Sequence, residues 1–305
     1  MMSIDQRIYP TFQQLAQLAR AGRQLSWHPP YQRLTALTGK HRSHQRGRGL
    51  DFIELRHYHP GDDVRHIDWR VTQRTGKPFL RVYAEENDKN IALLVDLRNT
   101  MFFASDGQMK SVVATELAAL CIGAACKEGD RVGAVILTVN DILFVPFRRG
   151  EKAAMALLQR LETYAQRLPQ WGSVSSAPSL SDGLKHLVDL GLKESQCFIM
   201  SDFHDYEAQE TNTLLHVLAK RNSLIGFKVM DPLEERFPHH SFVLGDEEGQ
   251  VEIPSSGEKV RLTYEQFVAR HNQQLSSHFN DLKLSLIEIT THRQVWSQLQ
   301  EMSDE

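Results

Sequence analysis

Short apolar runs alternate with longer amphipathic segments from about residue 90 onward. Apolar runs of this length, bounded by polar residues, are typical of strands that are buried on both faces of a sheet. They lie at 91–96, 131–138, 142–147, 197–202, 223–230 and 283–290. Segments with the spacing of an α-helix lie at 110–129, 151–168, 179–191, 207–221, 263–279 and 293–300. This alternation predicts an α/β fold, a Rossmann-like three-layer domain with a mostly parallel sheet between helices.

Three segments depart from this alternation. Asn140-Asp141 predicts a hairpin turn between the runs at 131–138 and 142–147, which gives the sheet one antiparallel strand. Before residue 88 we expect a helix at 11–20 and two strands, and residues 231–262 read as a β-hairpin across an acidic turn. Since an isolated hairpin is marginally stable, we expect it to pair with the N-terminal strands in a small β-rich subdomain.

The predicted domain organisation follows from this division. Residues 1–88 form an N-terminal helix and β-rich segment, and residues 89–305 form the α/β domain with the β-hairpin insertion at 231–262. A chain of 305 residues is long enough for one large core and a smaller satellite.

Composition places the chain among average soluble proteins, with 41% hydrophobic and 24% charged residues. The N-terminus lacks the apolar centre of a signal peptide, and the longest apolar stretch is interrupted by Thr115 and Glu116. Three cysteines without metal-like spacing fit a reducing compartment. We therefore expect a cytoplasmic protein without membrane insertion.

Charge is unevenly distributed. Residues 40–81 hold ten Lys and Arg and five Asp and Glu, a balance of +5. Since the net charge of the whole chain is −3, the remaining residues together carry −8. One hypothesis is a nucleic-acid-binding protein that uses the basic segment 40–48, with Lys40, Arg42, Arg46 and Arg48. Few aromatic residues interleave with these cations, and the pI near 6.5 weakens this hypothesis.

Two of the predicted strands end in aspartate, Asp96 in "LLVDLRNTM" and Asp202 in "FIMSDFHD". Ligands of such folds bind at the carboxyl ends of the strands. This pattern resembles the von Willebrand factor A domain, in which a D-x-S-x-S loop, a threonine and a further aspartate hold a divalent cation in a metal-ion-dependent adhesion site. Hydroxyl and carboxylate oxygens suit Mg²⁺.

Matched to that pattern, this chain has a degenerate adhesion site. The first loop provides Asp96, Arg98 and Thr100, and Asp202 matches the third loop. The threonine position falls on Pro178, with Ser176 and Ser179 close by. An arginine remains protonated and repels a cation, so we expect no cofactor, with Asp96, Thr100 and Asp202 as weak candidates for Mg²⁺.

Two interpretations of Arg98 remain open at this point. In one, its guanidinium forms a fixed cation between Asp96 and Asp202. In the other, Asp96 caps the next helix and Arg98 points to solvent.

The stretch at residues 52–69 carries a second resemblance. Its pattern F-x-x-x-R-x-Y-x-x-G-D-D-x-R-x-I-D-W comprises Phe52, Arg56, Tyr58, Gly61, Asp62, Asp63, Arg65, Ile67, Asp68 and Trp69. Together with "GDRVG" at 129–133, "MSDF" at 200–203 and "DPLEERFP" at 231–238, it resembles the bacterial family "domain of unknown function 58" over nearly the whole chain. Members of that family place this segment just before a von Willebrand A-like domain.

The charged residues of this segment have a physical explanation. We expect Arg56, Arg65 and Arg70 to form forked pairs with Asp62, Asp63 and Asp68, and Trp69 to anchor the turn through its apolar area. Such a network either joins the small subdomain to the sheet or presents a recognition loop.

Catalytic motifs are mostly absent from the sequence, which lacks a P-loop, G-x-S-x-G and H-E-x-x-H. His57, His59 and His66 are weak candidates for a zinc site. A metal-dependent hydrolase at the strand ends is an alternative that lacks a paired general base or nucleophile. The resemblance implies instead a non-enzymatic interaction or assembly factor that works with a MoxR-type AAA+ ATPase and related von Willebrand A proteins, in complex maturation or envelope stress response.

Overall fold

The computed structural model describes residues 5–25, 50–59, 62–85, 89–168, 177–235, 242–245, 250–253 and 258–304. The chain divides into two compact units, one of Met1–Leu37 with Lys89–Glu305 and one of Thr38–Asp88. We call the first the main unit and the second the small unit, and each is described by itself.

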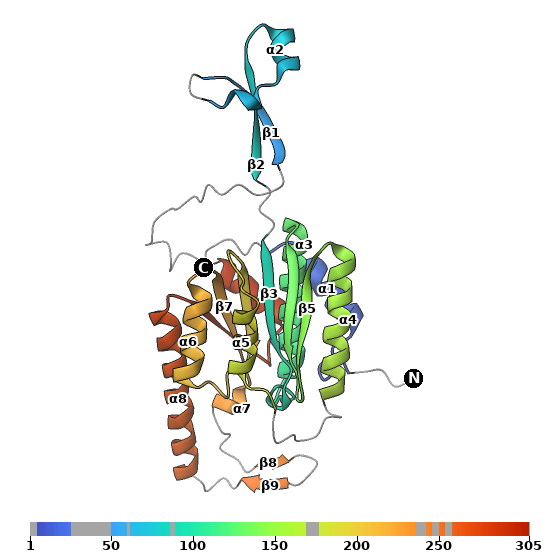
Figure 1. The fold of residues 1–305 in the computed structure, drawn as a ribbon. Helices are drawn as coiled ribbons and strands as arrows, with labels where there is room; N and C mark the ends of the chain where they lie inside the picture. The colour runs from blue at the N-terminus through green and yellow to red at the C-terminus, as the bar shows by residue number, and fades with distance from the viewer. Residues whose placement is uncertain are drawn as a thin grey trace. The chain divides into compact units, whose positions relative to one another are not determined.

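A six-stranded sheet forms the centre of the main unit (Figure 1). Its strand order is β10-β7-β6-β3-β4-β5, and all neighbouring pairs are parallel except β4 and β5. The strands are β3 (Asn90–Asp96), β4 (Arg131–Leu137), β5 (Ile142–Arg149), β6 (Gln196–Ser201), β7 (Ser223–Met230) and β10 (Ser285–Thr290). The predicted mixed α/β fold with a mostly parallel sheet and one antiparallel strand is confirmed.

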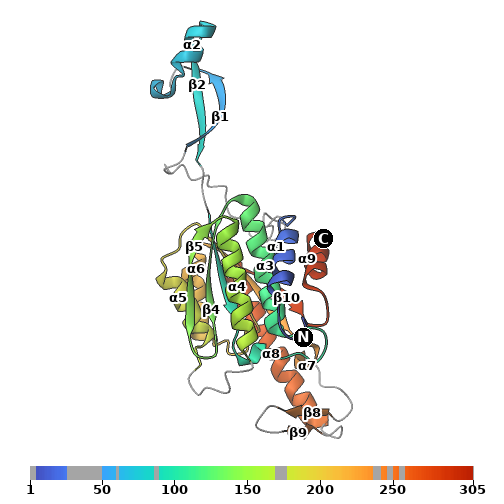
Figure 2. The same ribbon diagram turned by 90° about the vertical axis from the view of Figure 1, so that its right-hand side faces the viewer.

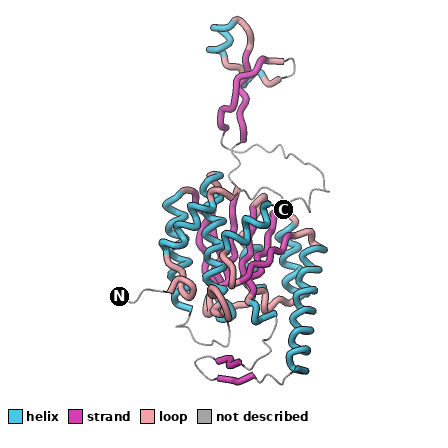
Figure 3. The backbone as a smooth tube through the Cα atoms, turned by 180° about the vertical axis from the view of Figure 1, so that it is seen from behind, coloured by secondary structure: helices cyan, strands magenta, loops and turns pink. Residues whose placement is uncertain are grey.

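Helices cover both faces of this sheet (Figure 3). One face packs against α1 (Phe12–Gly22), α3 (Lys110–Glu128), α4 (Glu151–Arg167) and α9 (Val295–Asp304). The other packs against α5 (Leu180–Asp189), α6 (Ala208–Ala219) and α8 (Glu258–Asp281). Successive residues of β3 alternate between the two cores, Leu93 with the first and Leu94 with the second. This two-sided burial explains why β3 is apolar at consecutive positions.

Helix α3 is buried on all sides because α1 lies on its outer surface (Figure 2). The two helices approach closely at glycines: a Cβ on Gly123 would lie 1.8 Å from the carbonyl oxygen of Ala19. The predicted domain boundary at residue 88 placed the N-terminal helix with the small unit, but α1 belongs to the main unit. Burial of Leu15 and Ala19 against α3 explains the difference.

The small unit consists of an antiparallel pair, β1 (Leu50–His57) and β2 (Phe79–Glu85), with a 3₁₀ helix (Val64–His66) and α2 (Trp69–Thr75) between them. Helix α2 ends at Gly76, which adopts the left-handed conformation with φ of 70°. Gly61 and the basic segment 40–48 lie outside the described residues.

The predicted hairpin within 231–262 is present as β8 (Phe242–Gly245) paired with β9 (Gln250–Ile253), after α7 (Pro232–Glu235). Among the described strands β8 and β9 pair only with each other, and the expected pairing with the N-terminal strands stays a prediction. Within the described part of the chain, no helix has the length and apolar character needed to span a membrane.

Candidate functional site

The candidate site lies where β3 and β6 end. These strands are adjacent and parallel, which confirms the prediction that Asp96 and Asp202 lie at one edge of the sheet. Both carboxylates are buried. We define the apex as Asp96, Arg98, Lys110, Asp202, Asp205 and Glu234, and the following paragraphs describe their contacts.

Arg98 bridges two carboxylates. Its guanidinium donates to Asp96 from Nε at 2.9 Å and from Nη2 at 2.6 Å, and to Asp205 from Nη1 at 2.5 Å and from Nη2 at 3.0 Å. Its Nη1 also donates to the carbonyl oxygen of Pro178 at 3.2 Å. The residue is buried, so the interpretation that it points to solvent is wrong. Arg98 is a fixed cation, but its second carboxylate is Asp205 and not Asp202.

Both members of the central pair have shifted pKa values. Burial raises the pKa of Asp96 above its ordinary value, against the opposing hydrogen bonds from Arg98. Burial alone would lower the pKa of Arg98, but hydrogen bonding to Asp96 and Asp205 raises it. The pKa of Asp205 is lowered because its hydrogen bonds with Arg98 outweigh its burial. Arg98 therefore remains charged.

The loop after β6 is held against Asp96 by hydrogen bonds. The Ser201 hydroxyl donates to Asp96 at 2.7 Å and accepts from the N–H of Phe203 at 3.0 Å. Phe203 is fully buried with φ of 54°, a strained conformation for a bulky residue. His271 on α8 donates from Nε2 to the carbonyl oxygen of Phe203 at 3.1 Å. These contacts fix the loop that carries Asp202 and Asp205.

A second buried cation occupies the other side of the apex. Lys110, at the start of α3, donates to Asp202 at 2.9 Å and also to Glu234 on α7. The hydroxyl of Thr100 and the N–H of His204 also bond the Asp202 carboxylate. Burial alone would raise the pKa of Asp202, but Lys110 outweighs it, so the pKa is lowered. Asp202 is therefore ionised and paired with Lys110.

The donor set at the apex does not fit a divalent cation. Asp96 accepts from Arg98 and Ser201, and Asp202 accepts from Lys110, Thr100 and His204, so the oxygens that would bind Mg²⁺ already have donors. Two cationic side chains at this place would also repel a metal ion. The described residues contain no group of three His, Cys, Asp or Glu side chains arranged for a metal, the histidines of the small unit included.

The second loop of the predicted adhesion site contributes main-chain groups. Pro178 offers its carbonyl oxygen to Arg98, and Ser179 begins α5, where its hydroxyl and Asp182 form a capping box. Ser179 is therefore a helix cap and not a ligand. Ser176 lies outside the described residues.

In the small unit the predicted arginine–aspartate network is only partly present. Arg56 forms a forked pair with Asp62 at 2.7 and 2.8 Å, which lowers the pKa of Asp62 to about 2. Asp63 and Asp68 instead cap helices, accepting from the N–H groups of Arg65 and of Arg70 and Val71. The expected pairs of Arg65 and Arg70 with these aspartates are therefore wrong: the short helices use the carboxylates as N-caps.

The aromatic residues of the signature segment include one that differs from the expectation. Trp69 is 64% exposed, so it does not anchor the turn, and Tyr58 is half-buried.

Sequence reasoning missed three residues of the apex, Lys110, Asp205 and Glu234, and also Ser201, which donates to Asp96. Asp205 had a local signal, since it follows Asp202 by three residues in "SDFHD" and a loop of this length returns a side chain toward the strand end. Lys110 and Glu234 had no such signal, because they come from α3 and α7 and only the fold places them beside Asp202.

Comparison with known proteins identifies related chains. "Uncharacterized protein Mb1516" of Mycobacterium bovis and "Uncharacterized protein Rv1480" of Mycobacterium tuberculosis are each 27% identical over 261 residues, 84% of this chain and 80% of theirs. Among solved structures, BatB from Bacteroides thetaiotaomicron and an aerotolerance-related membrane protein from Bacteroides fragilis each have a TM-score of 0.43 at 14% identity, covering 71% of this chain and all of theirs. The chain belongs to the family described as "Protein of unknown function DUF58", whose model matches residues 54–274.

Proposed function

We propose that the main unit is a von Willebrand factor A-like domain whose apex binds a partner protein without a metal ion. The partner is a MoxR-type AAA+ ATPase, and the chain acts beside it in the cytoplasm as an assembly factor rather than an enzyme. The choice of partner rests on the family resemblance in the sequence. The mode of binding rests on the contacts at the apex.

The observation that carries this proposal is the replacement of a metal position by two internal cations. In an adhesion site the metal ion leaves one position open for a partner carboxylate. Here Arg98 and Lys110 are buried and already paired, with side-chain exposures of 10% and 1%. A partner carboxylate would therefore have no metal ion and no unpaired cation of the apex to bind. We infer that the partner contacts the exposed and partly exposed residues around the apex, Thr100, His204, Asp205 and Glu234, which we call the rim.

The charge of the rim indicates the chemistry of the partner surface. The apex contains four carboxylates and two cations. Its most exposed charged side chains are the carboxylates of Asp205 and Glu234, which are 34% and 35% exposed. Thr100 and His204 at the same edge are also exposed. A basic patch on the partner is the complementary surface, because Arg98 is buried and already paired with Asp96 and Asp205.

The test is binding of the full chain to the purified MoxR-type ATPase encoded in the same genome, measured by biolayer interferometry with and without EDTA. Thr100→Arg places a positive charge on the rim and should weaken binding at least about tenfold, since like charges across an interface cost several kcal/mol. Thr213→Arg, the same change at an exposed position of α6, is the control and should leave affinity unchanged. Equal affinity of both variants, or loss of binding in EDTA, would refute the proposal.

A further inference from the structure

The outer edge of β10 has a gap in its hydrogen bonding. β10 is the last strand of the sheet and pairs only with β7 among the described strands. The N–H of Thr291 donates to Met230 on β7, so the main-chain groups of odd-numbered residues face β7 and those of even-numbered residues face outward. The outward groups of β10 therefore belong to Leu286, Glu288 and Thr290.

At both ends of this outer edge, other parts of the chain form hydrogen bonds with the outward main-chain groups. The amide of Gln298 on α9 accepts from the N–H of Thr290 at 2.9 Å and donates to its carbonyl oxygen at 3.0 Å, as a neighbouring strand would. Just before β10, the N–H of Leu284 donates to Phe279 at the end of α8. Between these two closures, the outward main-chain groups of Leu286 and Glu288 have no partner in the described part of the chain.

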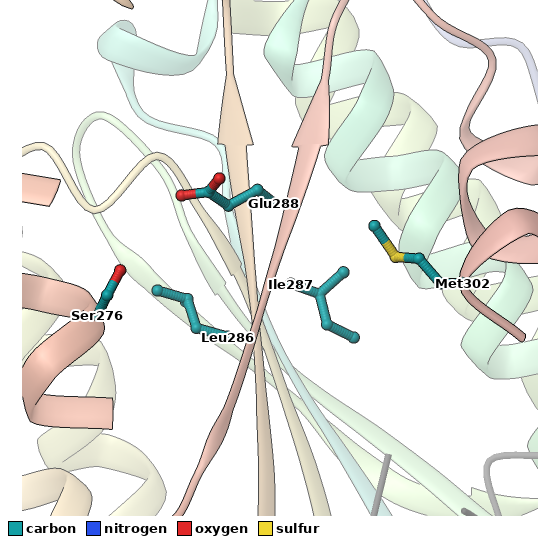
Figure 4. A pocket seen from close by; sticks show the side chains of 5 residues that line it. All are labelled: Ser276, Leu286, Ile287, Glu288 and Met302. Carbon is teal, nitrogen blue, oxygen red and sulfur yellow. The ribbon is translucent and has the colours of Figure 1, made fainter. Parts of the chain in front are cut away.

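A hollow of about 440 Å³ lies along this gap and is lined by Ser276, Leu286, Ile287, Glu288 and Met302 (Figure 4). Leu286 and Glu288 point to the side of Ser276 on α8, whereas Ile287 points to the side of Met302 on α9. A strand laid along β10 would place its own side chains alternately on these two sides.

We propose that this edge binds an extended segment of a partner protein by strand addition. The main-chain groups of Leu286 and Glu288 provide the hydrogen bonds, and the apolar surface formed by Leu286, Ile287 and Met302 accepts alternate apolar side chains. The Glu288 carboxylate, half-exposed beside the buried Lys228, favours a basic residue opposite it. This site is separate from the apex, so the inference does not rest on the proposed function.

The helices that flank β10 favour a lone segment over a second copy of the chain. The hollow along β10 is open to solvent and is flanked by Ser276 of α8 and Met302 of α9. In a second copy the same edge carries its own α8 and α9, which would have to fit against Ser276 and Met302 of the first copy. A single strand without flanking helices enters such a hollow.

The test uses a display library of random octapeptides, selected on the full chain and counter-selected on Ser276→Trp, which fills the hollow from α8. Selected peptides should alternate apolar residues, and their synthetic forms should bind Ser276→Trp at least about tenfold more weakly than the unaltered chain, since a blocked groove loses both hydrogen bonds and apolar contacts. Ser277→Trp, at the exposed neighbouring position of α8, is the matched control and should bind normally. Met302→Trp blocks the hollow from the other wall and serves if Ser276→Trp fails to fold.

Amide hydrogen exchange gives a second readout. In the free chain the amides of Leu286 and Glu288 should exchange faster than those of Ile287 and Ile289, and bound peptide should slow them. Failure to select any peptide that is sensitive to Ser276→Trp and insensitive to Ser277→Trp would overturn the proposal. Slow exchange of both amides without peptide would also overturn it, as would a dimer in sedimentation velocity that Ser276→Trp dissociates.

Discussion

Replacement of Arg98 by serine tests directly how much its guanidinium contributes to the main unit. The change removes five side-chain hydrogen bonds, of which two go to the fully buried Asp96 and two to the partly exposed Asp205. Loss of one member of a buried pair usually costs about 3–5 kcal/mol, because a buried charge is left without compensation. At about 2–4 °C per kcal/mol for a unit of this size, the melting temperature should fall by roughly 6–20 °C.

Arg293→Ser is the matched control for this experiment. It breaks an ion pair with Glu301 whose side chains are 44% and 62% exposed, and such surface pairs contribute only about 0–1 kcal/mol. Differential scanning calorimetry of both variants in metal-free buffer at neutral pH provides the comparison. A loss in Arg98→Ser that is no larger than the loss in Arg293→Ser would refute the assignment of Arg98 as a structural cation.

The change in melting temperature of Arg98→Ser with pH is a second, independent test of this role of Arg98. Burial raises the pKa of Asp96, and without Arg98 nothing of comparable strength opposes it. A raised folded-state pKa means that stability is present at low pH and is lost as the pH rises through that value. The variant should therefore lose more of its melting temperature at pH 8 than at pH 5, relative to the unaltered chain.

Removal of the Arg98 guanidinium should also create a metal site at the apex, where metal binding is unfavourable in the unaltered chain. In the double variant Arg98→Ser with Pro178→Thr, the freed oxygens of Asp96 and two new hydroxyls resemble an adhesion site. A ligand present at about 100 times its Kd stabilises the folded state by about 2.7 kcal/mol. Recovery of the melting temperature on addition of MgCl₂ is the expected result, and no recovery at any concentration would contradict the likeness to an adhesion site.

Three further predictions concern other residues of the main unit. Lys110→Met leaves the buried Asp202 without its cation and should cost about 3–5 kcal/mol in urea unfolding, whereas Lys228→Met, whose partner Glu288 is half-exposed, should cost less. The pKa of Asp205 is lowered, so its contribution to stability is present at neutral pH and is lost as the pH falls below about 3.8; Asp205→Asn should flatten the acid limb of a plot of melting temperature against pH. Gly123→Ala should destabilise the unit by about 1–3 kcal/mol and should expose α1 to limited proteolysis, because the added Cβ collides with the main chain at Ala19.

The elements of the main unit were predictable from the sequence because their signals are local. The run at 91–96 is apolar at consecutive positions since β3 is buried on both faces, and Asn140-Asp141 does form the turn between β4 and β5. The position of α1 was not predictable in this way. Its apolar stripe predicts a helix but not its partner, which depends on the absence of a side chain at Gly123, a hundred residues away.

The candidate site was predictable only as far as the topology of parallel strands determines it. Asp96 and Asp202 lie together because parallel strands end at one edge, and this follows from the sequence pattern. The pairing of charges does not follow, since Arg98 had two aspartates within reach and Lys110 comes from a separate helix. In the small unit the expected ion pairs competed with helix capping, and Asp63 and Asp68 cap helices.

The central claim is that Arg98 and Lys110 occupy the apex carboxylates and so prevent metal binding. Isothermal titration of MgCl₂ into the unaltered chain tests this claim most directly. Asp96 and Asp202 have their donors in Arg98 and Lys110, so no oxygen set of the kind that Mg²⁺ requires is available. We predict no heat beyond that of dilution up to about 10 mM, a concentration that would fill even a weak hard-cation site with a Kd of about 10⁻⁴–10⁻³ M. Binding of Mg²⁺ with a submillimolar Kd that disappears in Asp96→Asn would contradict the account.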